Sequence, residues 1–328
     1  MILPTLRSVL CAAALVLAIS PAEGQHDAAA DYPQRSVKIV VSVPAGGGVD
    51  TVTRIFAAGL QQRLGQPFVV ENRVTSGGII ATQQVADAPA DGHTLLVTFD
   101  TFAVNPFLYR DLRWEPLRDF APVMQVCRYP QVLVVHPSLG VKSVPEFVAL
   151  AKERGSSLNY GSAGPASSSR LAYELFKQVA GIETVPIHYR GGGPATQDLV
   201  GGQVQVMLIQ GGGAIVQHIK AGKVTALAVS TAERSKFYPG LPTIGETYPG
   251  FESQSWAAIF APAQTPRPVL ERLHATLARL VADSAVRERL EGQSCEIIGG
   301  SAEALSELVK SEQAKWGRLI REMHITVD

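Results

Sequence analysis

The chain has 328 residues, and its 29 basic residues balance its 29 acidic residues, so the formal net charge is zero. Because the sequence has no basic stripe and no polybasic segment, it argues against nucleic-acid binding and against attachment to an anionic membrane surface. A chain of this length has more residues than normally pack around one hydrophobic core, so we expect two lobes.

The first 24 residues have the pattern of an export signal. Arg7 gives a positive start, residues 9–19 are apolar but too few to span a membrane, and residues 22–24 suit cleavage. A buried N-terminal helix is the alternative interpretation. Cys11 precedes most of the apolar stretch and is a poor lipid-anchor site. No later segment has about 20 uninterrupted apolar residues, so we predict a soluble, exported mature chain.

Two cysteines remain after the predicted signal, Cys127 and Cys295. An oxidising compartment permits a disulfide between them, but the sequence does not place them within bonding distance. Our interpretation favours two buried free thiols over a disulfide.

The most informative segment is the glycine-rich loop at residues 44–50. It follows a β-branched run at residues 37–43 that predicts a strand, and it precedes apolar residues at helical spacing from Val52 to Leu60. A helix start leaves about four amide groups unpaired and carries a partial positive charge. Glycines let a ligand approach such a backbone closely. We therefore predict an anion site, with a plain tight turn as the alternative. Neither the dinucleotide fingerprint nor a P-loop is matched, which favours a small carboxylate.

Strands and helices alternate along the rest of the chain, which predicts α/β lobes with largely parallel sheets. The apolar runs at residues 123–126 and 132–135, split by Tyr129 and Pro130, are interpreted as the crossing into the second lobe. Further strands are expected at residues 67–72, 93–99, 158–160, 185–189, 204–209, 226–230 and 255–260. Further helices are expected after residues 76–78 and at residues 171–179, 268–280, 284–290 and 302–321.

The strand–loop–helix pattern recurs in the second lobe. The small-residue loop at residues 161–169 precedes an amphipathic helix, although a serine-rich linker is the alternative. A third glycine-rich turn occupies residues 191–194, and the strand at residues 204–209 ends at Gln210. In the first lobe, Asp100 and Thr101 follow a strand end that points the same way as the first glycine loop.

Titratable residues form no obvious catalytic set. The histidines lack metal-ligand spacing, residues 161–164 lack the nucleophile elbow, and His136 and His188 have no partner nearby in sequence. Asp50 is interpreted as the N-cap of the first helix, or as a group that holds a water or a ligand amino or hydroxyl group. Arg170 is either a surface residue or a two-pronged partner for a second acid group.

Many short motifs together carry a family resemblance. They include residues 44–50, 65–73, 91–96, 105–109, 160–164, 171–177, 189–191, 199–204, 221–223, 241–243 and Trp256. From about Tyr32 to its end, the chain resembles the substrate-binding proteins of tripartite tricarboxylate transporters, known as Bug or TctC-like receptors.

The resemblance implies a type II periplasmic-binding-protein-like α/β fold, in which two Rossmann-like lobes flank a hinge and a ligand cleft. Residues 33–125 with 255–328 would form lobe 1, residues 126–254 would form lobe 2, and the hinge would lie near residues 123–132 and 250–257. It also implies a monomeric periplasmic receptor without cofactor, metal or enzymatic activity. The loops at residues 43–51 and 162–170 would hold a carboxylate by backbone groups and waters.

The resemblance and the loop patterns together predict the ligand-binding residues: Val43, Ala45, Gly46, Gly47, Gly48, Asp50, Thr51, Asp100, Thr101, Ser162, Ala163, Ala166, Ser167, Arg170 and Gln210. Three departures from the family pattern fall among them. Val43 replaces a frequent aromatic residue, Ala166-Ser167 with Arg170 replaces Gly-Ser leading to a histidine, and Gln210 replaces a frequent aspartate. The last two changes would make the cleft more positive, which favours a ligand with two carboxylates or an additional anionic group.

We thus expect a receptor that captures a small mono- or dicarboxylate and delivers it to the membrane subunits of a tripartite tricarboxylate-type transporter. A stand-alone receptor that signals to a sensor kinase of a two-component system is one alternative. A periplasmic hydrolase that uses Ser162 or Ser167 is the other.

Overall fold

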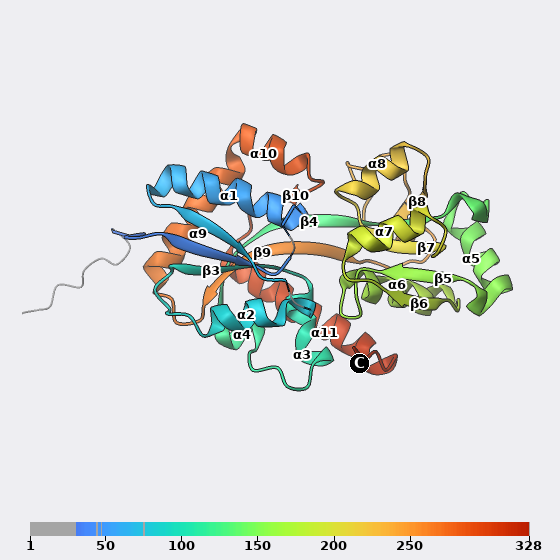
Figure 1. The fold of residues 1–328 in the computed structure, drawn as a ribbon, viewed down its shortest axis with the longest axis horizontal. Helices are drawn as coiled ribbons and strands as arrows, with labels where there is room; N and C mark the ends of the chain where they lie inside the picture. The colour runs from blue at the N-terminus through green and yellow to red at the C-terminus, as the bar shows by residue number, and fades with distance from the viewer. Residues whose placement is uncertain (1–30, 44, 47, 75, 328) are drawn as a thin grey trace, which may run out of the picture.

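The computed structural model describes residues 31–327 except 44, 47 and 75, and the predicted export signal lies outside these residues. Within this part of the chain, one ten-stranded sheet runs in the order β2-β1-β3-β9-β4-β7-β5-β6, and β8 and β10 also pair with β4. Helices cover both faces of the sheet (Figure 1). None of the described helices has the length and apolar content required to cross a bilayer.

The first half of the sheet holds the N-terminal strands and the chain end. Its strands are β1 (Val37–Val41), β2 (Phe68–Asn72), β3 (Thr94–Phe99), β9 (Gln254–Pro262), β10 (Glu296–Ile297) and the first part of β4 (Phe120–Val135). One face carries α1 (Gly48–Leu64), α9 (Arg267–Ala282) and α10 (Ser284–Glu291). The other face carries α2 (Ile79–Ala86), α3 (Thr101–Leu108), α4 (Pro116–Asp119) and α11 (Ala302–Glu322).

Strand alternation explains these two layers. Val37, Ile39 and Val41 point into the core beneath α1, whereas Val40 packs in the core on the opposite face. A strand buried on both faces reads as a continuous apolar run, which is why β1 could be predicted directly from the sequence.

The second half of the sheet is built in the same way. Its strands are β5 (Asn159–Ser162), β6 (Val185–His188), β7 (Val206–Gln210), β8 (Thr225–Val229) and the last part of β4. Its helices are α5 (Val144–Arg154), α6 (Ser168–Ala180), α7 (Gly192–Val200) and α8 (Ala214–Lys220). Short 3₁₀ turns complete the described elements: η1 (Ser76–Gly78), η2 (Pro137–Leu139), η3 (Gly155–Ser157) and η4 (Ile244–Glu246).

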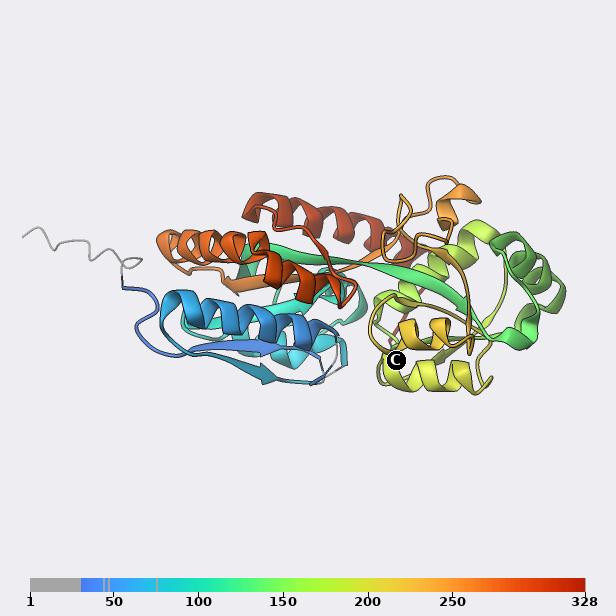
Figure 2. The same cartoon turned by 90° about the horizontal axis from the view of Figure 1, so that it is seen from above.

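Strand β4 joins the two halves. Residues Phe120 to Pro130 pair with β9, and residues Gln131 to Val135 pair with β7 and β8. In Figure 2 the same strand runs in green through the length of the molecule. The prediction of two short runs split at Tyr129 was therefore wrong, because one strand with register shifts spans both. The prediction of largely parallel sheets was also wrong at the centre, where β9 and β4 pair antiparallel with their neighbours.

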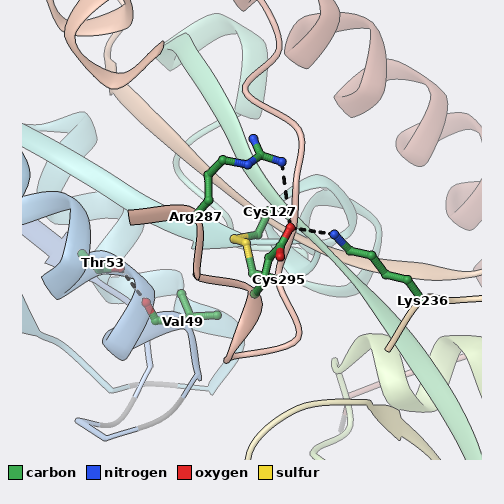
Figure 3. Close-up of a disulfide and its surroundings, with 7 residues drawn as sticks. Val49, Thr53, Cys127, Lys236, Arg287 and Cys295 are labelled. Atoms are coloured by element: carbon green, nitrogen blue, oxygen red, sulfur yellow. Dashed lines mark hydrogen bonds and ion pairs between the residues drawn. A yellow bond between two sulfur atoms is a disulfide. The ribbon is translucent and has the colours of Figure 1, made fainter. Parts of the chain in front are cut away.

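A disulfide joins Cys127 of β4 to Cys295, 168 positions further along the chain (Figure 3). The preference for free thiols was therefore wrong. Strand β10 pairs antiparallel with β4 directly after Cys295, and Arg128 binds Glu296 through two hydrogen bonds of 2.9 and 2.6 Å. This long-range pairing brings the two cysteines together, and the local sequence around each of them does not indicate it.

Removing the disulfide should lower the stability of the fold. For a Cys127→Ala/Cys295→Ala variant we expect the free energy of unfolding to fall by about 2–4 kcal/mol, because the unfolded chain regains the entropy of a long loop. Urea titration followed by circular dichroism measures this. Thiol titration of the denatured, unreduced wild type should find no reactive thiol beyond Cys11. Two additional thiols would contradict the disulfide.

Candidate functional site

The first glycine loop is held in place by Asp50. Its carboxylate accepts hydrogen bonds from the amide of Gly46 at 2.8 Å, from Asn72 Nδ2 at 2.8 Å and from Arg54 Nε at 3.0 Å. The predicted N-cap role was wrong, because α1 already begins at Gly48 and the Asp50 side chain reaches back to the preceding loop. Asp50 is only 2% exposed, so its carboxylate serves the loop.

Burial by itself would raise the pKa of Asp50. The hydrogen bonds from Arg54, Gly46 and Asn72, together with the charge of Arg54, outweigh this effect and lower the pKa. Asp50 therefore stays charged at neutral pH. It compensates part of the cationic end of α1 while it fixes the loop.

The remaining predicted residues of this loop differ in exposure. Ala45 and Gly46 are exposed, Thr51 is half-buried, and Val43 is half-buried against the core of the first half. Gly47 lies outside the described residues.

The loop faces the second half of the sheet at Gly48. A Cβ placed on Gly48 would lie 3.7 Å from Nε2 of Gln210, which ends β7. The predicted residues Gly48 and Gln210, which are far apart in sequence, are therefore neighbours in the structure.

Beside this loop lies a set of residues that our sequence analysis missed. Ser42 follows β1, Gly78 precedes α2, and Asn105 lies on α3. A Cβ on Gly78 would lie 2.7 Å from that of Ser42, and the backbone φ of 73° also favours glycine. Asn105 Nδ2 donates to the Gly77 carbonyl at 2.7 Å. Residues 105–109 are one of the motifs that carry the family resemblance, but the sequence analysis assigned them no role. This motif is the sequence signal that could have indicated Asn105.

Asp100 and Thr101 lie at the end of β3, as predicted, and both are buried. Among the described residues, neither carboxylate oxygen of Asp100 has a hydrogen-bond partner, and the Thr101 hydroxyl also lacks one. The Ser42 hydroxyl and Asn105 Oδ1 share this property. An unpaired buried polar group costs about 1–3 kcal/mol, so a cluster of them marks a place that binds a polar partner.

Burial raises the pKa of Asp100 to about 7, against the opposing effect of the Ser255 and Ser168 hydroxyls and the Thr101 amide. The charge of Glu312 raises the pKa further. The three donors lie near enough to favour the charged form, but none meets the carboxylate with hydrogen-bond geometry. Ser168 belongs to α6, so the second half of the sheet reaches Asp100.

The second small-residue loop is ordered by its own serines. Ser167 is the N-cap of α6: its hydroxyl accepts from the Arg170 amide at 3.3 Å and donates to the Gly164 carbonyl at 2.7 Å. The Ser169 hydroxyl accepts from the Ala163 amide at 2.8 Å. Because the cap occupies the third amide of α6, the first two amides have no intrahelical partner.

Two predicted residues of this loop point elsewhere. Ala166 is 3% exposed and packs in an apolar cluster with residues of α3 and α11. The Arg170 guanidinium donates to the carbonyls of Pro165 at 2.8 Å and Thr326 at 2.6 Å. It therefore ties the loop to the C-terminal segment.

Ser162 ends β5 and is fully buried. Its Oγ lies 2.7 Å from Nδ1 of His188 and 3.2 Å from the Gly164 carbonyl. Burial and the charge of Arg170 lower the pKa of His188, which favours the neutral ring. A hydrolytic triad would also need a carboxylate hydrogen-bonded to the second ring nitrogen. No such bond joins His188 to a carboxylate in the described part of the chain.

The described residues contain no group of three or more His, Cys, Asp or Glu side chains placed to hold a metal ion. The polar groups gathered here are hydroxyls, amides and one carboxyl group. They can form hydrogen bonds to a small polar molecule.

A sequence model described as "Tripartite tricarboxylate transporter family receptor" (TctC) matches residues 52–325. The chain belongs to this family. A UPF0065 protein of Pseudomonas sp. (strain P51) is 37% identical over 324 residues, covering 98% of this chain and 96% of the relative.

Solved structures agree with the family assignment. A Rhodopseudomonas palustris protein solved with adipate is 34% identical, with a TM-score of 0.83 over 89% of this chain and 98% of that one. The periplasmic binding protein BugD is 33% identical, with a TM-score of 0.81 over 90% and 99%. MatC from R. palustris with bound malate is 32% identical, with a TM-score of 0.79 over 88% and 100%. The fold is that of type II periplasmic binding proteins, and these neighbours are solute-binding proteins rather than enzymes.

Replacing Asp50 tests its role in the loop. For Asp50→Asn we expect the free energy of unfolding to fall by about 1–2 kcal/mol at pH 7, because the charged hydrogen bonds are lost. Since the native pKa of Asp50 lies below its ordinary value of 3.8, this contribution is complete above that value. It disappears as the pH falls through the lowered native pKa.

Urea unfolding at several pH values measures this difference. Asp87→Asn, at an exposed residue that follows α2, is the matched control. A stability difference that stays constant down to the lowest pH would refute the proposed charge.

Proposed function

We propose that this chain is an exported receptor that captures a small organic acid between the two halves of its sheet. One observation carries the proposal: among the described residues, unpartnered buried polar groups of Ser42, Asp100, Thr101 and Asn105 gather around the start of α3, and Ser168 at the start of α6 lies close to Asp100. The relatives with bound adipate and malate support a carboxylate as the ligand.

The recognition chemistry follows from the backbone. Helix starts supply unpaired amides and a partial positive charge, which suit one carboxylate without a basic side chain. Each charge-assisted hydrogen bond contributes about 1.5–3 kcal/mol. About four such bonds, after the costs of ordering and desolvation are subtracted, are consistent with a binding free energy of about −8 kcal/mol. This free energy corresponds to a micromolar Kd.

The binding motion we propose is closure of two lobes, residues 33–125 with 255–328 against residues 126–254. Strand β4 supports a hinge near residues 123–132, because it belongs to both halves of the sheet. At this crossing, Gln131 is fully buried, its side-chain Oε1 accepts from the Ser253 hydroxyl at 2.9 Å, and its backbone N–H donates to Ser230 Oγ at 3.1 Å.

The receptor would work in the periplasm and pass its ligand to the membrane subunits of a tripartite tricarboxylate-type transporter. The family description and the periplasmic neighbours support this. A sensor kinase as the partner would use the same binding residues, and only a pull-down from membranes separates the two partners.

Binding is tested by calorimetry of the purified chain with mono- and dicarboxylates. We expect at least one acid to bind with a micromolar Kd. Thr101→Val should weaken it about tenfold without loss of stability, because the variant removes a buried hydroxyl that has no protein partner.

Thr276→Val is the matched control, since this buried hydroxyl only donates to the Arg272 carbonyl within α9. Failure of every acid to bind the wild type would refute the function. Equal affinity of wild type and Thr101→Val would exclude Thr101 from the site.

Closure is tested at the ion pair between Lys236, in the loop after β8, and Glu291 of α10, with Nζ and Oε1 2.6 Å apart. Arg287 also pairs with this carboxylate, at 3.9 Å, and dashed lines mark the contacts of Lys236 and Arg287 in Figure 3. The pair is partly exposed, so its worth is about 1 kcal/mol or less. We expect Lys236→Glu or Glu291→Lys to weaken ligand binding about two- to fivefold.

The double exchange should restore affinity, because it reverses the pair and keeps the attraction. Arg234→Glu breaks a similar pair with Glu246 that lies within the second half of the sheet, and it serves as the control. If that control weakens binding as much as Glu291→Lys does, closure through the Lys236–Glu291 pair is refuted.

A further inference from the structure

Asp100 is a buried acid to which binding of the ligand carboxylate by helix starts gives no role. It is 3% exposed, it lies at the end of β3, and its side chain makes no capping bond to α3. Both oxygens lack a hydrogen-bond partner among the described residues. A carboxylate left without partners in this way is costly, so its retention calls for a partner that arrives from outside the chain.

The groups around Asp100 come from three other elements. Ser255 lies on β9, Ser168 begins α6, and Glu312 lies on α11. The two serines carry no charge. The charge of Glu312 opposes ionisation of Asp100, and burial has the same effect and is larger.

The cations near this region are committed elsewhere. Lys315 of α11 donates to the Glu252 carbonyl and lies 4.6 Å over the Trp316 ring. Nη1 of Arg170 donates to the carbonyls of Pro165 and Thr326, whereas its buried Nε has no partner among the described residues. Among the described residues neither is bonded to Asp100, and the charge that acts on Asp100 is that of Glu312.

We propose that Asp100 is a specificity-determining residue that accepts a hydrogen bond from an ammonium group of the ligand, so that the receptor selects an amino acid over the plain carboxylic acid of the same length. The proposal rests on the function proposed above and names the second group that the ligand must carry. The helix starts bind the carboxylate, and Asp100 meets the amine.

This assignment reverses the ligand expected from the sequence. Gln210 and Arg170 suggested a positive site for a second carboxylate, but the Arg170 guanidinium is used by the C-terminal segment. A second ligand carboxylate beside Asp100 and Glu312 would have to bring or find a proton, because like charges repel at short distance. An ammonium group needs no additional proton, and its positive charge neutralises the buried acid.

The test is calorimetry with ligands matched in carbon number. The series are succinate, malate and aspartate, then glutarate, 2-hydroxyglutarate and glutamate, then adipate and 2-aminoadipate. At the length that fits, we expect the amino member to bind about tenfold or more tightly than the unsubstituted acid. Asp100→Asn should abolish this preference, so that the amino member and the unsubstituted acid of the same length bind the variant with equal affinity.

A second measurement needs no variant. Burial holds the pKa of Asp100 at about 7, and an adjacent ammonium would lower it. Binding of the amino member at pH 7 should therefore release protons, which appears as different calorimetric enthalpies in phosphate and Tris buffers.

A variant of Glu312 is the control for this proton release. Glu312, the other acid acting on Asp100, accepts hydrogen bonds from the indoles of Trp316 at 2.8 Å and Trp256 at 3.4 Å. Glu312→Gln should keep a smaller release, because loss of the Glu312 charge lowers the pKa of Asp100.

The outcomes are distinct. An unsubstituted acid that binds as tightly as its amino counterpart, a preference that survives Asp100→Asn, or proton uptake on binding would each overturn the role of Asp100 and leave the receptor function standing. If no acid of any series or class binds the wild type, the receptor function itself falls. Asp87→Asn, an exposed acid, controls for a general effect of lost charge.

Discussion

The continuity of strand β4 is the constraint on which the rest of the structure depends. Its first part pairs with β9 and its last part pairs with β7 and β8, so both halves of the sheet are registered against one backbone. The disulfide at Cys127 and the bidentate pair of Arg128 with Glu296 attach the segment after α10 to the same strand. The end of α10 and the start of that segment approach the second half of the sheet, where Glu291 pairs with Lys236 and Gln293 lies beside Gly212.

On this frame, the polar residues around the candidate site fall into two groups. Asp50 and the serines after β5 have their hydrogen-bonding capacity used by neighbouring backbone and side chains, so they fix the shape of their loops. Asp100 and Thr101 have buried oxygens with no such partners in the described part of the chain. The first group preorganises backbone amides, which lowers the cost of binding. The second group has capacity left for a ligand, and this separation of roles is what a selective binding site requires.

The sequence predicted the elements whose pattern is local. The strands predicted before the two small-residue loops and the helices predicted after them recur in the structure as β1, β5, α1 and α6, because apolar spacing encodes them. Long-range pairings escaped prediction. Cys127 pairs across 168 positions, and Arg170 finds a carbonyl 156 positions away. Asn105 reaches the Gly77 carbonyl through the packing of α3 against η1, which no sequence period reveals.

Arg170 and Asp100 show why the type of a residue does not by itself establish its role in a binding site. Arg170 was expected to make the cleft more positive, but its Nη1 donates to two backbone carbonyls that lie outside the helices. Asp100 was predicted as one of fifteen binding residues, and among the described residues it is an acid with unpartnered oxygens where β3, β9 and α6 meet. What a ligand meets is the capacity left after the protein has satisfied itself. By that measure the site offers a backbone that attracts an anion and one carboxyl group that attracts a cation, a pair of demands that a zwitterion meets in a single small molecule.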